Sequence, residues 1–436
     1  MKKLLALHAM LISVAISQGQ VASPGGVLQG KALIRYATAH IGDGRVIDNA
    51  LIEIQNGEIN RVVDAATTRV TESEYDTIIN ADGLHAYPGM IAMDSRLGLV
   101  EIDAVKATRD FQETGKWLPM VRALPAYNAE SKIIPTVRAN GVLIAQIAPV
   151  GARISGSSSV VNLDAWNWRD AVLTRDEGVF MNWPSRYKYK GWWAEQGPAA
   201  ANKKYLDERQ ELYQYFAEAK AYAAMPHPDP INLGFEAMRG LFDGKKTLYI
   251  RANWARDILD AIKLARKFGI SRFAIVGAAE AHLCATQLRE SGATVVLTRV
   301  HRLPDHPDEP ITLPFELPRI LNDSGVSFCF SMAGSMEAML TRNLPFEVGT
   351  AVHYGLPYEK AVSALTLVPA RLLQIDNKYG TLEAGKSATL FLSEGDPLSI
   401  SGNKVKLALI DGRVASLESH QEILYEKFST GRELRE

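Results

Sequence analysis

Short segments in which apolar and polar residues alternate lie near both ends of the chain. They occupy residues 32–37, 51–55, 58–63 and 77–81, and again 388–392 and 406–410. The second and third are joined by Asn56-Gly57, and the last is followed by Asp411-Gly412. These dipeptides are typical of two-residue hairpin turns. The pattern predicts one small β-rich unit assembled from both ends of the chain.

Between these ends, short apolar segments alternate with helical patterns, which is typical of a parallel α/β barrel. Ile258, Ala261, Ile262 and Ala265, for example, have the spacing of one helix face within residues 255–268. We count eight candidate strands, the number a barrel needs. They are residues 90–93, 142–147, 160–163, 179–182, 248–251, 273–276, 294–297 and 326–330.

Three segments follow from these patterns. Residues 23–86 and 376–436 together are expected to form a β-sandwich, and residues 87–375 the barrel. A charged helical insert is expected near residues 185–235, with its helix over about 194–225. It follows the fourth strand, so it would either cover the mouth of the barrel or pack outside it.

The first 22 residues have the pattern of a secretory signal peptide. Lys2 and Lys3 precede an apolar run over 4–16 and then small residues. The run is too short to span a bilayer stably, so we expect cleavage, a periplasmic or secreted protein and no stable membrane anchor. The alternative is an uncleaved N-terminal helix that is buried in the fold.

Composition narrows the class of partner. The 436 residues, 47% of them hydrophobic, can form a substantial core. A formal net charge of −1 argues against a nucleic-acid partner. The two cysteines, Cys284 and Cys329, lie in apolar surroundings, which predicts buried thiols rather than a disulfide. The chain has neither a Gly-x-Ser-x-Gly elbow nor a Walker-type phosphate loop.

Residues 87–101 read Tyr-Pro-Gly-Met-Ile-Ala-Met-Asp-Ser-Arg-Leu-Gly-Leu-Val-Glu. This segment resembles the first barrel strand of the amidohydrolase superfamily. Residues 380–386 resemble that family's return to its sandwich, and residues 128–159 resemble its periplasmic imidazolonepropionase-like branch. The resemblance implies a (β/α)8 TIM barrel with a composite β-sandwich built from both chain ends.

The family uses one or two zinc or similar divalent ions, but the resemblance places other residues at the ligand positions. Asp94 and Arg96 stand where the first strand has its histidine pair, and Arg251 stands where the fifth has a histidine. Gly277 and Ser331 replace the ligands of the sixth and eighth strands. A carboxylate can hold a metal, whereas a guanidinium has no lone pair to offer. We therefore expect no metal cofactor.

Two interpretations of this charge cluster remain open. Asp94, Arg96 and Arg251 would form either a buried ion-pair plug or a pocket for a small anionic ligand. Other candidate ligand-binding residues are Arg153, Ser155, Asn253, His301 and Ser331. His301 begins the segment 301–309, which would be a rigid loop or hold an adventitious metal. Asp94 is the one candidate catalytic residue.

The leading functional hypothesis is an exported amidohydrolase-family pseudoenzyme that binds a small molecule or stabilises a partner. The alternative is an active hydrolase of carbon–nitrogen bonds, in non-peptide or dipeptide amides, with an atypical site. A third view is a subunit of a homo-oligomer, or of a hetero-oligomer with a metal-bearing paralogue.

Overall fold

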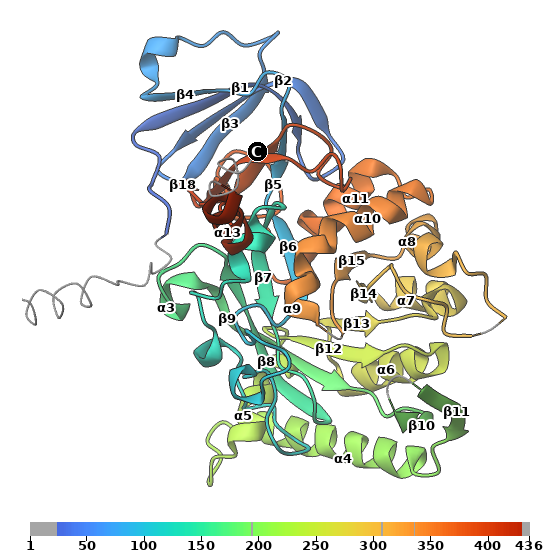
Figure 1. Ribbon diagram of the computed structural model, residues 1–436. Helices are drawn as coiled ribbons and strands as arrows, with labels where there is room; N and C mark the ends of the chain where they lie inside the picture. Colours follow the sequence, from blue (N-terminus) through green and yellow to red (C-terminus); the bar gives the residue numbers. More distant parts are fainter. Residues whose placement is uncertain (1–23, 193–194, 307, 335, 430–436) are drawn as a thin grey trace, which may run out of the picture.

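The computed structural model describes residues 24–192, 195–306, 308–334 and 336–429. A sheet lies at one end of the molecule and a closed barrel of eight strands lies next to it (Figure 1). The predicted signal peptide, residues 1–22, lies outside the described residues. Within the described part of the chain, no helix is long and apolar enough to cross a membrane.

The sheet at the end of the molecule contains strands from both ends of the chain. Its order is β18-β17-β16-β5-β1-β2-β3, and β4 also pairs with β1. The hydrogen bonds join these strands into one sheet, so the composite sheet agrees with the sequence pattern while the two-layer sandwich stays a prediction. The strands are β1 (Lys31–His40), β2 (Val46–Gln55), β3 (Glu58–Asp64), β4 (Thr77–Asn80), β5 (His85–Pro88), β16 (Leu390–Ser393), β17 (Val405–Ile410) and β18 (Arg413–Val414).

The two predicted hairpin turns are confirmed, and they touch each other. Asn56 and Gly57 (φ 54° and 79°) join β2 to β3, while Asp411 and Gly412 (φ 49° and 74°) join β17 to β18. A Cβ on Gly412 would lie 2.5 Å from the Cα of Gly57. Glycine is therefore needed both for the left-handed backbone and for the close approach of the turns.

The eight predicted barrel strands are confirmed, with the third and fourth longer than expected. The barrel closes in the order β12-β13-β14-β15-β6-β7-β8-β9. Its strands are β6 (Met90–Ser95), β7 (Val142–Ile147), β8 (Ile154–Asn162), β9 (Val172–Asn182), β12 (Thr247–Ala252), β13 (Phe273–Gly277), β14 (Thr294–Thr298) and β15 (Phe328–Ser331).

The expectation of an all-parallel barrel is wrong at β8, which runs antiparallel to both β7 and β9. Only residues 148–153 connect β7 to β8. A parallel neighbour would need a crossover of a dozen or more residues, so this short link forces the chain to turn back.

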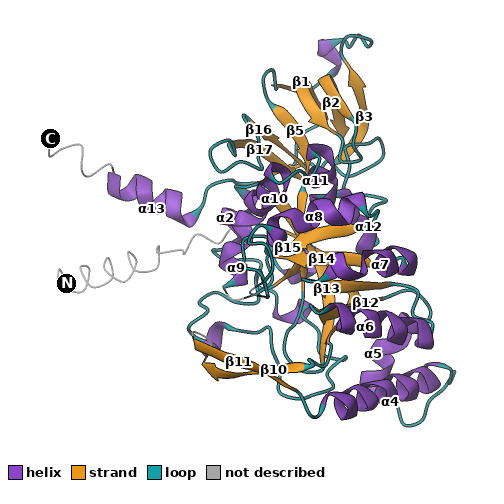
Figure 2. Cartoon of the chain, turned by 90° about the vertical axis from the view of Figure 1, so that its right-hand side faces the viewer, coloured by secondary structure: helices purple, strands orange, loops and turns teal. Residues whose placement is uncertain are grey.

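Helices cover the outside of the barrel, and most lie after β9 (Figure 2). Helix α6 shows why they form, since its predicted apolar face is buried and Gly269 (φ 72°) ends it. The helices are α2 (Ile134–Arg138), α3 (Trp168–Ala171), α4 (Tyr205–Ala223), α5 (Leu233–Phe242), α6 (Ala255–Phe268), α7 (Ala285–Ser291), α8 (Leu313–Asp323), α9 (Glu337–Leu340), α10 (Leu344–His353), α11 (Tyr358–Leu365), α12 (Leu367–Leu372) and α13 (His420–Ser429). Short 3-10 helices are η1 (Glu72–Glu74), η2 (Lys106–Thr108), η3 (Leu124–Ala126), η4 (Ala281–Cys284) and η5 (Thr341–Asn343).

The insert after β9 is only partly helical, which corrects the prediction. A hairpin of β10 (Tyr187–Trp192) and β11 (Glu195–Ala201) precedes α4 and projects from the body of the molecule (Figure 2). Alternating tyrosine and lysine over residues 187–190 is a strand pattern that explains this difference. Both cysteines are buried free thiols, as predicted.

Candidate functional site

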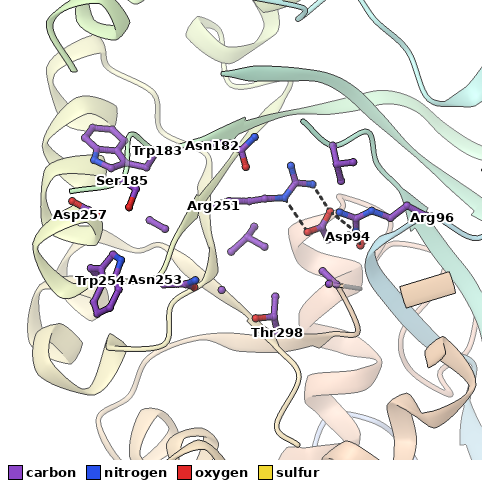
Figure 3. A pocket seen from close by; sticks show the side chains of 16 residues that line it. Asp94, Arg96, Asn182, Trp183, Ser185, Arg251, Asn253, Trp254, Asp257 and Thr298 are labelled. Atoms are coloured by element: carbon purple, nitrogen blue, oxygen red, sulfur yellow. Dashed lines mark hydrogen bonds and ion pairs between the residues drawn. The ribbon is translucent and has the colours of Figure 1, made fainter. Parts of the chain in front are cut away.

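A cavity of about 480 Å³ opens at the C-terminal ends of the parallel barrel strands (Figure 3). Five strands, β6, β9, β12, β13 and β14, each supply a residue within one or two positions of their last residue. This is the end of a barrel at which binding and catalytic groups gather. The cavity is lined by Asp94, Arg96, Val150, Asn182, Trp183, Ser185, Arg251, Ala252, Asn253, Trp254, Asp257, Val276, Gly277, Thr298, Ala333 and Gly334.

Asp94 lies at the floor of this cavity with no exposed surface. Its backbone is left-handed (φ 47°), a conformation that aspartate tolerates better than most residues. Its N–H donates to Gln146 Oε1 at 3.0 Å, and this hydrogen bond holds the strained backbone of Asp94 in place. The carboxylate is thereby turned toward the side chain of Arg251.

Arg251 forms two hydrogen bonds with the carboxylate of Asp94. Its Nη2 donates to Asp94 Oδ1 at 2.6 Å and its Nε donates to Oδ2 at 3.2 Å, the bidentate geometry that suits a planar guanidinium. The guanidinium stacks on the ring of Phe180 at 4.5 Å. Burial lowers the pKa of Arg251 and the charge of Asp94 opposes this shift, so the arginine stays a cation at neutral pH.

Arg96 completes the cluster from the other side. Its Nη1 donates to the backbone oxygen of Asp94 and lies 3.3 Å from Asp94 Oδ1. Its backbone N–H donates to Glu337 Oε2 at 2.8 Å, and Ser95 Oγ donates to the other oxygen of Glu337 at 2.8 Å. Burial raises the pKa of Glu337, while the charge of Arg96 opposes the rise. Two arginines and two carboxylates thus alternate across the floor.

A polar network continues from the floor into the barrel. Gln146 accepts from Asp94 N–H and donates through Nε2 to Glu177 Oε1 at 2.7 Å. Ser158 Oγ donates to the same oxygen at 2.6 Å, and the Tyr249 hydroxyl donates to Oε2 at 3.0 Å. Burial raises the pKa of Glu177, and these hydrogen bonds hold it down. The cavity floor therefore rests on a hydrogen-bonded core.

The wall opposite the arginines carries an acidic residue between aromatic rings. Asp257 accepts from Arg186 Nε at 2.8 Å, yet burial raises its pKa to about 6. Trp183 and Trp254 lie at the edges of this wall, and the Trp183 indole N–H donates to the Tyr205 hydroxyl at 3.3 Å (Figure 3). The cavity thus has the arginines and Asp94 on one side and Asp257 with two tryptophans on the other (Figure 3).

Residues 315–417 match the sequence pattern of the Amidohydrolase family. A segment of 94 residues is also 32% identical to Amidohydrolase tasK of Hapsidospora irregularis, covering 22% of this chain and only 9% of that protein. Over these two segments the chain is similar in sequence to amidohydrolases.

Solved amidohydrolases have the same fold. An amidohydrolase from Thermotoga maritima aligns with a TM-score of 0.72 and 22% identity, covering 88% of this chain and 99% of its own. A Xaa-Pro dipeptidase with bound methionine aligns at 0.55 and 15%, covering 89% and 100%. A putative prolidase from Bifidobacterium longum aligns at 0.52 and 16%, covering 89% and 95%. At these identities the likeness is one of fold.

The residues at the mouth of this barrel do not fit a divalent metal. Both oxygens of Asp94 already accept from Arg251, and guanidinium groups have no lone pair for a metal. A divalent ion about 4 Å from one guanidinium would be repelled by roughly 8 kcal/mol at an effective dielectric of about 20. Within residues 24–429, apart from the four positions left out, no three His, Cys, Asp or Glu side chains gather to hold a metal ion.

Two further predicted residues lie where β8 begins: Arg153 directly precedes the strand and Ser155 is its second residue. Ser155 Oγ donates to the Gly151 carbonyl at 2.6 Å and receives a long contact of 3.4 Å from Arg251 Nη1. Arg153 turns away, donating to the Asn182 carbonyl at 2.8 Å and to Glu208 at 3.2 Å. Neither residue lines the cavity.

The remaining predicted residues separate into those at the cavity and those outside it. Asn253 lines the cavity, at the start of the loop after β12. Ser331 is buried at the end of β15, where its hydroxyl accepts from the Ala333 N–H at 2.9 Å. His301 bonds to Thr350 Oγ1 at 2.6 Å and contacts Glu347, so it packs on α10 outside the cavity.

Sequence reasoning missed three important groups. Glu337 lies in α9, after the eighth barrel strand, and nothing in its local pattern indicates that it returns to Arg96. Gln146 sits in an apolar strand, where a lone polar residue was the available signal. Asp257 belongs to the first turn of α6, and only the three-dimensional arrangement brings it to the cavity.

Proposed function

We propose that this protein is an exported amidohydrolase-family pseudoenzyme that binds a small carboxylate at the barrel mouth without a catalytic metal. The observation that supports the proposal is the bidentate Arg251–Asp94 pair at the cavity floor. The pair supports the proposal because fixed cationic donors would then stand where the resemblance expects the family's metal ions.

The cavity keeps room and donors for an anion above this pair. Arg251 is 17% exposed and its Nη1 makes only the 3.4 Å contact with Ser155. One edge of the guanidinium is therefore available to a carboxylate, which pairs well with such a planar donor. The ion pair forms the floor of the pocket and does not fill it.

The test combines metal analysis with ligand titration. We expect protein purified without chelators to contain substoichiometric zinc, iron or manganese. We expect small carboxylates to give saturable heats in calorimetry that Arg251→Gln removes. Arg45→Gln is the control, because Arg45 lies in the turn between β1 and β2, away from the cavity, and is 62% exposed. Stoichiometric metal with chelator-sensitive amide hydrolysis, or binding indifferent to Arg251→Gln, would overturn the proposal.

The alternative is hydrolysis of a carbon–nitrogen bond at an atypical site. Asp257 favours it, because burial raises its pKa to about 6 and it lines the same cavity. A carboxyl with that pKa suits acid–base work near neutrality. Turnover of amides or dipeptides that Asp257→Asn abolishes in a folded protein would favour this enzyme over the binding protein.

Export rests on the pattern of residues 1–22. We expect the full chain, expressed in a bacterium, to appear in the periplasmic fraction with a new N-terminus near residues 18–23. N-terminal sequencing of the mature protein measures this directly. Recovery of the intact chain from the cytoplasm alone would contradict export.

A further inference from the structure

A second cavity of about 240 Å³ adjoins the first, on the other side of Arg96. Three residues line both cavities: Arg96, Val150 and Gly334. The second cavity is further lined by Val100, Glu101, Asp103, Phe111, Ile133, Met336, Glu337, Ala338 and Met339. A ligand held by the arginines therefore has a neighbouring compartment within reach.

The two cavities differ in chemistry. The second cavity has six apolar lining residues that do not line the first. Arg251 lines only the first cavity, and Arg96 lines both. Of the three acidic residues in the second cavity, Glu337 is engaged by Ser95 and Arg96 and Glu101 accepts from Asn128 at 3.2 Å. This compartment suits an apolar group and disfavours a second anion.

Arg96, Val150 and Gly334 lie between the two cavities, since each lines both. Arg96 is held by Asp94 on one side and Glu337 on the other, so its aliphatic stem cannot swing freely. Gly334 has no side chain to narrow the passage, and a Cβ there would meet the guanidinium of Arg299 at 3.3 Å. A ligand that reaches both cavities would therefore pass beside Gly334 and the fixed Arg96.

We propose that the ligand is a monocarboxylate with an apolar chain, whose carboxylate binds at Arg251 and Arg96 and whose chain fills the second cavity. This inference rests on the proposed function and names the ligand class of that site. The 240 Å³ compartment equals roughly eight water-sized groups at about 30 Å³ each, which limits the chain to about that many heavy atoms.

The experiment is a calorimetric titration of the full-length protein with straight-chain monocarboxylates from acetate to octanoate. Burying one methylene contributes about 0.8 kcal/mol, so affinity should rise about fourfold per added carbon once the chain passes Arg96. The dicarboxylate suberate, of the same length as octanoate, should bind more weakly than octanoate because its second carboxylate would meet Glu101 and Asp103.

Two variants test the second cavity separately. Ala338→Phe fills it from α9. Met339→Glu adds a charge at a residue that is 41% exposed, so we expect this second variant to fold normally. Both should abolish the gain with chain length and leave acetate binding unchanged. Leu283→Glu, at a 65% exposed residue that lines neither cavity, is the matched control.

The outcomes separate the two proposals. Acetate binding that depends on Arg251 but does not strengthen with chain length overturns the inference and leaves the proposed function standing. A gain with chain length that survives both cavity variants also overturns the inference. If neither acetate nor octanoate binds, or if Arg251→Gln changes neither, the proposed function itself fails.

Discussion

Replacing Arg251 by glutamine should destabilise the fold, because Asp94 would remain buried with half of its compensating charge removed. Asp94 has no exposed surface, and Arg251 supplies two of its charge-assisted hydrogen bonds. Removing one partner of such a buried pair costs about 3–5 kcal/mol. Arg96 still lies 3.3 Å from Asp94 Oδ1, so we expect the lower end, about 3 kcal/mol.

The assay is urea unfolding followed by circular dichroism at neutral pH, arranged as a double-mutant cycle. Arg251→Gln and Asp94→Asn should each lower the free energy of unfolding. The double variant should lose less than the sum, with a coupling of about 1–3 kcal/mol, because no unpaired charge remains. Arg45→Gln, on an exposed pair with Asp43, should cost no more than about 1 kcal/mol. A loss below about 1 kcal/mol for Arg251→Gln, or no coupling, would refute the assignment of a tight buried pair.

Three further predictions concern other parts of the molecule. Burial and the neighbouring His40 lower the pKa of His85, which faces His40 at 3.2 Å in a cluster with Tyr87, Glu359 and Asp396. The unfolded chain then binds the proton more readily, so His85 makes the free energy of unfolding fall as the pH drops below about 6.5. In thermal melts, His85→Gln should reduce the dependence of the melting temperature on pH, and an unchanged dependence would contradict this prediction. Tyr249→Phe should lower the free energy of unfolding by about 1–3 kcal/mol, because an oxygen of buried Glu177 loses its donor. Tyr425→Phe, at a 75% exposed residue, should leave it unchanged, and equal urea midpoints for the two variants would contradict this prediction. Gly412→Ala should lower the melting temperature more than Gly83→Ala, because both have a φ of 74° but only Gly412 would meet another backbone; equal losses would show that the turns do not touch.

The periodic parts of the fold were predictable from sequence. Apolar runs and the helix face of 255–268 predicted strands and helices because burial enforces those spacings. Asn56-Gly57 and Asp411-Gly412 predicted hairpins because their turns need positive φ. The direction of β8 was predicted wrongly, because an apolar run has the same pattern in either direction. The six residues 148–153 that link β7 to β8 are too few for the crossover of a parallel strand.

The candidate site was predictable only where strand ends define it. Asp94 and Arg251 were expected to approach each other because parallel strands end at the same edge of a barrel, and they do. The positions of Glu337 and Asp257 depend on how α9 and α6 pack, which no local pattern encodes. For the same reason His301 was expected near the mouth and instead packs on α10.

The order in which the chain is synthesised gives the sheet a particular vulnerability. Strand β5 pairs with β16, about three hundred residues later, and Gly57 rests against Gly412. Until β16 leaves the ribosome, β5 presents an open edge to any other chain. The protein therefore depends on β16 to cover an edge that β5 exposes much earlier in synthesis. Products truncated before residue 390 should aggregate rather than persist as stable fragments.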